Sequence, residues 1–220
     1  DDLRSLFGDK VATLVEGLTK IKTVLDAKVV AAGARYDNMR FSYQEYFERM
    51  TDAKSWGKPL AALLGALKMQ VELGLPSIGG KDSMSGTFRD INVPPMLMAF
   101  GITTVDARNV ISPEFKEGGH NIYVVRHTPT ENYMPATDQL KDNFDFVADK
   151  ILSGDIVAGY AVGFGGVAEA VAKMSFGNKI GAVLECDEQM LYNLSYGSIV
   201  VESRRTLNHP SAELIGKTVK

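Results

Sequence analysis

The sequence predicts an α+β protein built from two lobes, and three observations lead to this prediction. Apolar residues recur at helical spacing in several segments, the runs at 96–105 and 156–162 are rich in β-forming residues, and both kinds of segment occur on each side of a polar connector at 109–120. The connector combines a proline, several charges and paired glycines, which is typical of a boundary between domains. A chain of 220 residues suits one large or two modest domains.

Composition and net charge limit the classes of protein to which the chain could belong. With 45% hydrophobic and 23% charged residues, the chain is typical of a soluble globular protein. Its formal net charge of -3 argues against a nucleic-acid partner bound through a broad basic face. The apolar runs are short or interrupted by charge, and the start lacks a signal-peptide core, so we expect no membrane partner. The single cysteine, Cys186, cannot form an internal disulfide, and a reducing, cytoplasmic location is expected.

The first half of the chain is expected to contain two helices and a strand. From Lys10 to Ala32 one apolar face recurs at helical spacing, formed by Val11, Leu14, Val15, Leu18, Ile21, Leu25 and Val29. A strand is expected at 39–43. Pro59 marks the start of a second helix, which Gly74 and Pro76 end.

The second half is expected to alternate strands and helices. The run from Met96 to Val105 has apolar side chains that would fall on both faces of a strand, which predicts a strand with both faces covered. The remaining elements are a strand at 121–126, a helix at 138–152 capped by Thr137, a strand at 156–162, a glycine turn at 163–166, a helix at 167–174 and a β-rich end.

Residues 75–86 carry the densest chemistry, and the chain is organised around them. Small, cationic, anionic and hydroxylated residues gather there: Gly79, Gly80, Lys81, Asp82, Ser83 and Ser85. The glycines allow a ligand to approach the backbone amides, the lysine can reach a phosphate, and the aspartate is a hard oxygen ligand suited to Mg²⁺. The stretch is not a P-loop, because Asp82 stands where that motif needs Ser or Thr. The alternative is an ordinary polar turn between two strands.

Two further features are weaker candidates. Residues 163–166, Gly-Phe-Gly-Gly, come directly before a predicted helix and could offer amides to an anion, although a tight strand-to-helix turn is the alternative. The three histidines, His120, His127 and His209, show no catalytic or metal-ligand spacing, and we expect them to be solvated or at the edge of the core.

Three segments carry a resemblance to a known family: Ile78–Ser85, Val93–Pro95 and Gly159–Ala170. Together they resemble the phosphoribosylformylglycinamidine synthase family, and specifically the second of its two aminoimidazole-ribonucleotide-synthetase-like halves. The motif Gly-Lys-Asp-Ser-Met-Ser is the most specific element. The resemblance implies the aminoimidazole-ribonucleotide-synthetase-like fold, with an N-terminal sheet lobe at 1–116 and a C-terminal α/β lobe at 117–220.

The resemblance also implies a reaction. In the family, ATP phosphorylates the amide oxygen of formylglycinamide ribonucleotide, and ammonia then displaces phosphate from the iminophosphate to give the amidine. By position in the motif, Gly79, Gly80 and Lys81 correspond to ATP and phosphate contacts, Asp82 to a Mg²⁺ ligand, and Ser83 and Ser85 to substrate contacts. The catalytic histidine, the other half and the glutaminase that supplies ammonia have no counterpart here, so the chain is expected to be part of a longer enzyme.

Departures from the family keep two other interpretations open. Val24, Lys28 and Phe164 stand where relatives have carboxylates or an amide, which removes implied metal ligands. The chain could therefore be a non-catalytic half that completes a pseudo-dimer. It could also belong to another ATP-dependent enzyme of this superfold, of the aminoimidazole ribonucleotide synthetase, selenophosphate synthetase or thiamine phosphate kinase type. The apolar strand at 96–105 further predicts that the chain alone forms a homodimer.

Overall fold

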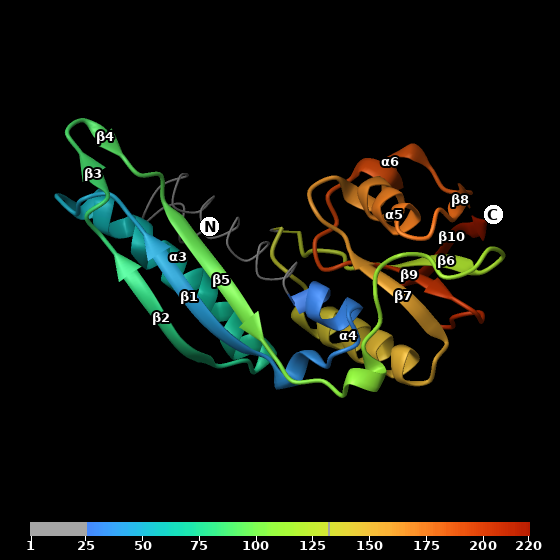
Figure 1. The fold of residues 1–220 in the computed structure, drawn as a ribbon. Helices are drawn as coiled ribbons and strands as arrows, with labels where there is room; N and C mark the ends of the chain where they lie inside the picture. Colours follow the sequence, from blue (N-terminus) through green and yellow to red (C-terminus); the bar gives the residue numbers. More distant parts are fainter. Residues whose placement is uncertain (1–25, 132) are drawn as a thin grey trace. The chain divides into compact units, whose positions relative to one another are not determined.

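The structure is a computed structural model, and it describes residues 26–131 and 133–220 (Figure 1). The described chain divides into two compact units. The first unit comprises Met39–Ile102, and the second comprises Thr103–Lys220 together with the described residues up to Asn38. The predicted helix at 10–32 lies mostly outside the described residues; residues 26–31 are helical, and the helix ends just before Gly33, as expected.

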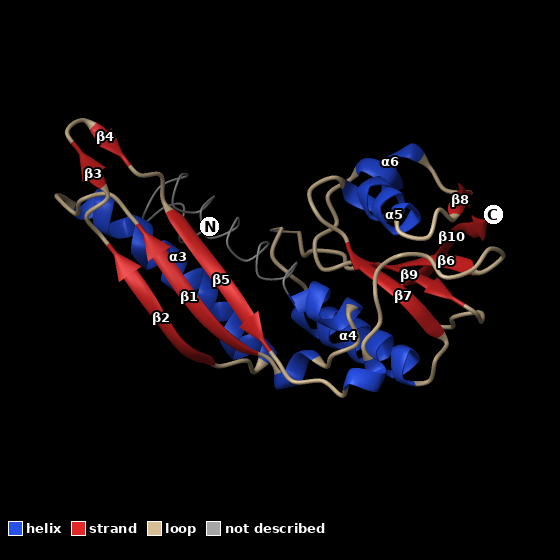
Figure 2. Ribbon diagram, in the orientation of Figure 1, coloured by secondary structure: helices blue, strands red, loops and turns tan. Residues whose placement is uncertain are grey.

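The first unit is a three-stranded sheet with one long helix on it (Figure 2). Its elements are β1 (Arg40–Tyr46), α3 (Ala53–Leu73), β2 (Ser77–Ser83), β3 (Thr87–Phe88), β4 (Ile91–Asn92) and β5 (Met96–Ile102). The strand order is β2-β1-β5, with β2 parallel and β5 antiparallel to β1, so β2 and β5 are the edges. β3 and β4 form a separate two-stranded hairpin.

Helix α3 begins earlier than the sequence predicts. Asp52 accepts a hydrogen bond from the Ser55 amide at 2.7 Å, and the Ser55 hydroxyl accepts one from the Asp52 amide at 3.0 Å, so the two residues form a capping box. Pro59 lies inside the helix rather than at its start, which corrects the prediction. The predicted end is confirmed, because Gly74 caps the helix in the left-handed conformation at φ 70°.

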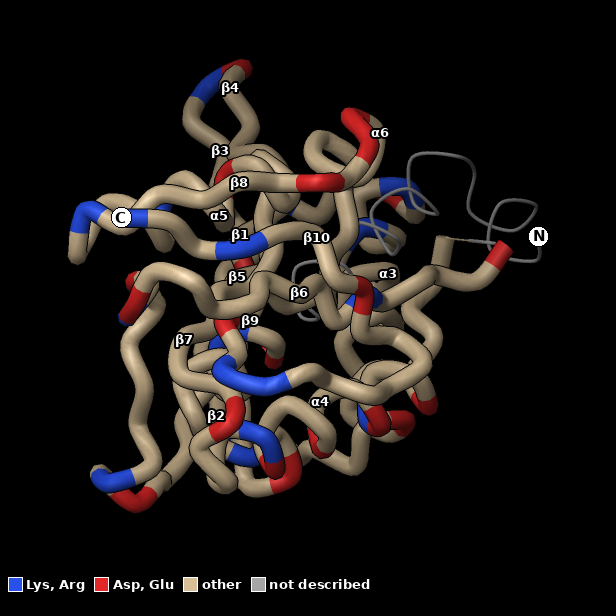
Figure 3. Tube along the Cα trace, turned by 90° about the vertical axis from the view of Figure 1, so that its right-hand side faces the viewer, with Lys and Arg blue, Asp and Glu red and all other residues tan. Residues whose placement is uncertain are grey.

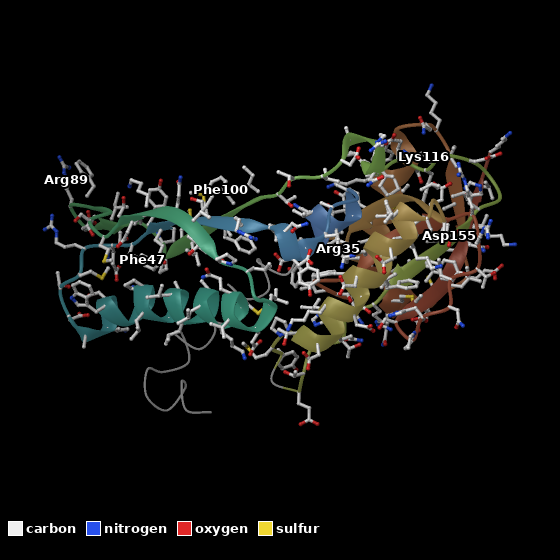
Figure 4. All side chains as sticks on the ribbon, turned by 90° about the horizontal axis from the view of Figure 1, so that it is seen from below. Arg35, Phe47, Arg89, Phe100, Lys116 and Asp155 are labelled. Atoms are coloured by element: carbon white, nitrogen blue, oxygen red, sulfur yellow. The ribbon has the colours of Figure 1, made fainter. Side chains whose placement is uncertain are left out.

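The core of the first unit lies between the sheet and α3. Phe47, Ala62, Ala66 and Leu97 form a buried cluster there, and Figure 4 shows Phe47 on the side of the sheet that faces α3. Phe100 lies on the other side, where Met96, Phe100 and Ile102 are exposed in one row along β5. The prediction that both faces of this strand are covered is therefore wrong for the described chain, because α3 covers only one of them.

The second unit is a five-stranded sheet in the order β7-β9-β6-β10-β8. Its elements are the short helix η1 (Tyr36–Asn38), η2 (Ala107–Asn109), β6 (Asn121–Val125), α4 (Thr137–Leu152), β7 (Ile156–Ala161), α5 (Gly166–Phe176), β8 (Gly181–Leu184), α6 (Glu188–Tyr192), β9 (Ile199–Ser203) and β10 (Ala212–Val219). The predicted strands at 121–126 and 156–162 and both predicted helices are confirmed. Thr137 is the first residue of α4 rather than its cap, and the side chain of the residue before it, Ala136, makes no capping hydrogen bond.

Helices cover both faces of this sheet (Figure 2). Val167, Val171 and Met174 of α5 pack with Ile122 and Val124 in one buried cluster. At the opposite face, Gly159 of β7 lies against residue Ala31 of the helical residues 26–31, and α4 contacts β7. None of the helices that the structure describes is long and apolar enough to cross a membrane.

Candidate functional site

A groove of about 530 Å³ lies in the first unit, between the β2 edge of the sheet and α3. Three of the predicted site residues, Gly80, Lys81 and Asp82, line it. Its other lining residues are Tyr43 and Glu45 of β1, Trp56, Pro59, Leu60 and Leu63 of α3, and Met84. The predicted glycine-rich stretch is thus a wall of a groove.

Most of the stretch is a strand, so the alternative of an ordinary polar turn between two strands is wrong for residues 77–83. Residues Ser77–Ser83 form β2, paired in parallel with β1, so Gly80 lies opposite Tyr43 and Asp82 opposite Glu45. A side chain at Gly80 would place its Cβ 2.6 Å from the Tyr43 carbonyl oxygen. Glycine is therefore required there by the close approach of two backbones.

Strand geometry separates Lys81 from Asp82. Consecutive side chains of a strand point to opposite faces of the sheet. The Lys81 ammonium group accordingly donates to the Ser83 hydroxyl and lies 5.2 Å from the centre of the Tyr46 ring. Asp82 shares the other face with Glu45. The structure thus brings Lys81 together with Ser83, and Asp82 together with Glu45.

The two carboxylates influence each other. Burial, followed by the nearby charge of Asp82, raises the pKa of Glu45 above its usual value. The described residues hold no cluster of three or more potential metal-binding His, Cys, Asp or Glu side chains. Mg²⁺ is usually held by one or two carboxylates together with substrate phosphates and water, so Asp82 and Glu45 alone do not make a complete metal site.

The remaining predicted site residues lie outside the groove. Gly79 is exposed, with open space where a side chain would project. Ser85 is exposed, and its carbonyl oxygen accepts a hydrogen bond from the Thr87 amide. Neither of the two residues lines the groove.

The glycine turn before α5 is already occupied by a side chain of the same helix. The Gly165 amide donates to Glu169 Oε2 at 2.7 Å, and Lys173 Nζ lies 2.5 Å from Glu169 Oε1. These contacts lower the pKa of Glu169, the lysine contributing most. Phe164 projects from the turn and is 84% exposed. The amide that was predicted to meet an anion therefore already binds the carboxylate of Glu169.

Sequence reasoning missed the groove residues Glu45 and Trp56 and the role of two histidines. His127 is 3% exposed; its Nε2 accepts from the Ala136 amide at 3.0 Å and its Nδ1 lies 2.7 Å from the Tyr196 carbonyl oxygen. His120 Nδ1 lies 2.6 Å from the buried Glu202 carboxylate. The alternation along β1 could have indicated which face of the sheet Glu45 occupies. It could not have indicated Asp82 as the neighbour of Glu45, because the long helix α3 separates β1 from β2 in the sequence.

Acidic and basic residues both occur throughout the described chain. Figure 3 shows acidic and basic residues interspersed along the described chain rather than gathered in one stripe.

No protein-family model matches the sequence, and no curated protein matches it. Solved structures do. Phosphoribosylformylglycinamidine synthase II from Thermotoga maritima superposes with a TM-score of 0.68 at 14% identity, over 96% of this chain and 39% of that one. Hydrogenase maturation protein HypE superposes with a TM-score of 0.68 at 15% identity, over 91% of this chain and 73% of that one. The chain has the aminoimidazole-ribonucleotide-synthetase-like fold.

Structures of T. maritima PurL with ligands share this fold. PurL complexed with ATP matches with a TM-score of 0.68 and PurL complexed with FGAR with a TM-score of 0.70, each at 12% identity and over 93% of this chain. The chain spans only 37% and 39% of those PurL chains. The predicted fold class and the predicted resemblance are confirmed. At these identities the likeness shows the fold alone.

Proposed function

We propose that the chain is part of an ATP-dependent, amidine-forming ligase of de novo purine biosynthesis, of the phosphoribosylformylglycinamidine synthase type. The observation that carries the proposal is the position of the Gly-Lys-Asp-Ser motif in the fold. This motif lies on β2, in a fold shared with PurL structures that were complexed with ATP and with FGAR. The proposed substrate is formylglycinamide ribonucleotide, and the product is the corresponding amidine.

The proposed reaction has two steps. The amide oxygen of the substrate attacks the γ-phosphorus of ATP and releases ADP; ammonia then adds to the imidate carbon, and phosphate leaves. Such a reaction depends on positioning and on stabilising charge at the transferring phosphoryl group. In this chain the backbone amides of Gly79 and Gly80 and the ammonium group of Lys81 are the groups suited to phosphate.

Asp82 has only Glu45 beside it, so the described groove supplies two carboxylates and no third metal-binding side chain for Mg²⁺. The remaining metal and nucleotide contacts of the proposed enzyme would come from its other domains, and ammonia from a glutaminase domain or subunit.

A second candidate function is a non-catalytic half that completes a pseudo-dimer. Two observations favour it. Lys81 and Asp82 lie on opposite faces of the sheet, and the Glu169 carboxylate already binds the Gly165 amide in the glycine turn at 163–166. In this case the exposed row on β5, formed by Met96, Phe100 and Ile102, would cover the equivalent face of another sheet. The chain alone would use the same row to form a homodimer.

The experiment is an assay of the longer enzyme that contains this chain. Formylglycinamide ribonucleotide, Mg-ATP and ammonia are supplied, and the amidine and ADP are measured in the same samples. The proposal predicts equal amounts of both products and no ADP release when the amide is omitted. ADP release with another acceptor of the superfold, but none with this amide, would contradict it.

A further inference from the structure

The groove of the first unit contains two carboxylates side by side. Glu45 of β1 and Asp82 of β2 are direct partners in the parallel register, and both line the groove. Side chains of such neighbours on one face lie about 5 Å apart at their Cβ atoms. That separation matches the span of a planar group with two N–H donors, which carboxylates bind well.

The opposite wall of the groove is aromatic and aliphatic. Trp56, Leu60 and Leu63 project from successive turns of α3, and Trp56 is 56% exposed. Tyr43 adds a second aromatic ring from β1. Aromatic faces attract cations, and apolar walls favour a flat hydrocarbon body.

Among the described lining residues, no basic side chain lies against the carboxylates of Glu45 and Asp82. Lys81 is the single basic residue of that lining, and its ammonium group instead contacts Ser83 and Tyr46 on the other face of the sheet. Two carboxylates held side by side repel each other, and a bound cation would relieve this repulsion.

We propose that the groove binds a small organic cation, an amidinium or guanidinium group attached to a flat apolar body, with Glu45 and Asp82 as the acceptors and Trp56 as the wall. The proposal does not depend on the reaction proposed above, because it rests on the α3 side of the sheet and on Glu45 and Trp56, which the motif does not include; Asp82 is the one acceptor that belongs to the motif. A phosphate group is disfavoured there, since it would meet two carboxylates without the lysine.

The test uses the 220-residue chain and its single tryptophan, Trp56, as an internal reporter. Benzamidine is titrated while the tryptophan emission is followed, and benzamide, which has nearly the same shape without the charge, is the matched control ligand. We expect saturable binding of benzamidine with a dissociation constant on the order of 1 mM, and at least about tenfold weaker binding of benzamide.

Charge-neutralising variants locate the acceptors. E45Q and D82N should each weaken benzamidine binding about tenfold, because each removes a charge-assisted hydrogen bond. D90N removes the same charge from the exposed turn between β3 and β4, outside the groove, and should bind as the unmodified chain does. Far-ultraviolet circular dichroism confirms that each variant is folded.

Three outcomes would overturn the proposal. The first is no saturable response to benzamidine, and the second is equal affinity for benzamidine and benzamide. The third is displacement of benzamidine by sub-millimolar MgCl₂ alone, which would assign the two carboxylates to a metal ion instead. Unchanged affinity in both E45Q and D82N would overturn the assignment of the acceptors.

Discussion

Lys81 and Asp82 are adjacent in the sequence, yet their charged groups lie on opposite faces of the same sheet. The Lys81 ammonium group contacts Ser83 and Tyr46, whereas Asp82 lies beside Glu45 in the groove. A single phosphate with its metal ion cannot contact both side chains in this arrangement. Their contributions to an enzymatic reaction should therefore be independent.

A double-mutant cycle in the longer enzyme measures that independence. We expect at least one of K81A and D82A to lower turnover about 10²-fold, as loss of a group that stabilises phosphoryl charge does. In the double variant the losses in activation free energy should add within about 0.5 kcal/mol, as they do for separate sites. A coupling energy well above that value would place the two side chains at one ligand.

The exposed row on β5 predicts self-association of the isolated chain. Phe100 is 51% exposed at the centre of the row, between Met96 and Ile102. A two-fold interface would bury this face twice, and about 1,600 Å² in total is typical of a stable pair. Light scattering after size exclusion should give a dimer at micromolar concentration.

Substitution locates that interface. F100D should yield a monomer, because it places a charge at the centre of an apolar contact. F88D, at the exposed β3–β4 hairpin, removes a phenylalanine that is even more exposed than Phe100 and should stay dimeric. A monomeric mass for the unmodified chain at every concentration would show that the row needs no partner.

The buried contact of His127 predicts a loss of stability in mild acid. Burial lowers the pKa of His127, and its Nε2 accepts from the Ala136 amide, so the folded chain holds the neutral ring. Below about pH 6.5 the unfolded chain takes up a proton that the folded chain does not. The free energy of unfolding should fall by at most about 1.4 kcal/mol per pH unit until the pH passes the lowered pKa.

Denaturant unfolding between pH 7.5 and 5.5 checks this slope. H127Q removes the titrating ring and should flatten the curve. H209Q removes a histidine that lies 3.0 Å from Asp142 near the surface, and it should leave the contribution of His127 in place. An H127Q curve as steep as that of the unmodified chain would assign the slope to other groups.

Glu202, in the second unit, predicts a large stability effect. Its fully buried carboxylate accepts from the amides of Lys116 and Glu117 at 2.7 and 3.2 Å and contacts His120. E202A leaves these groups without their buried acceptor and should cost roughly 3–5 kcal/mol of unfolding free energy. E213A breaks a 3.6 Å surface pair with Arg126 and should cost about 0–1 kcal/mol, so similar losses in both variants would contradict the prediction.

The sequence predicts most elements of the second unit because their patterns are local and strong. A short run of β-branched and aromatic residues identifies β6, and the apolar spacing of Leu140, Phe144, Val147 and Ile151 identifies α4. The start of α3 was missed because its capping box uses Ser55 in place of the usual Glu or Gln.

The candidate site was harder to predict. Glycines disfavour strands, so residues 77–83 look like a loop, and pairing with β1 overrides that preference. The partnership of Glu45 with Asp82 depends on the register of two strands separated by α3, which no local pattern specifies.

The central claim is that the chain supplies only part of a nucleotide site, and calorimetry tests it most directly. Mg-ATP is titrated into the 220-residue chain, with Mg²⁺ alone and ATP alone as controls. Since Lys81 and Asp82 do not converge and the described residues hold no complete metal cluster, we expect no binding tighter than about 1 mM. A dissociation constant in the low micromolar range would contradict this and show that the motif on β2 is sufficient by itself.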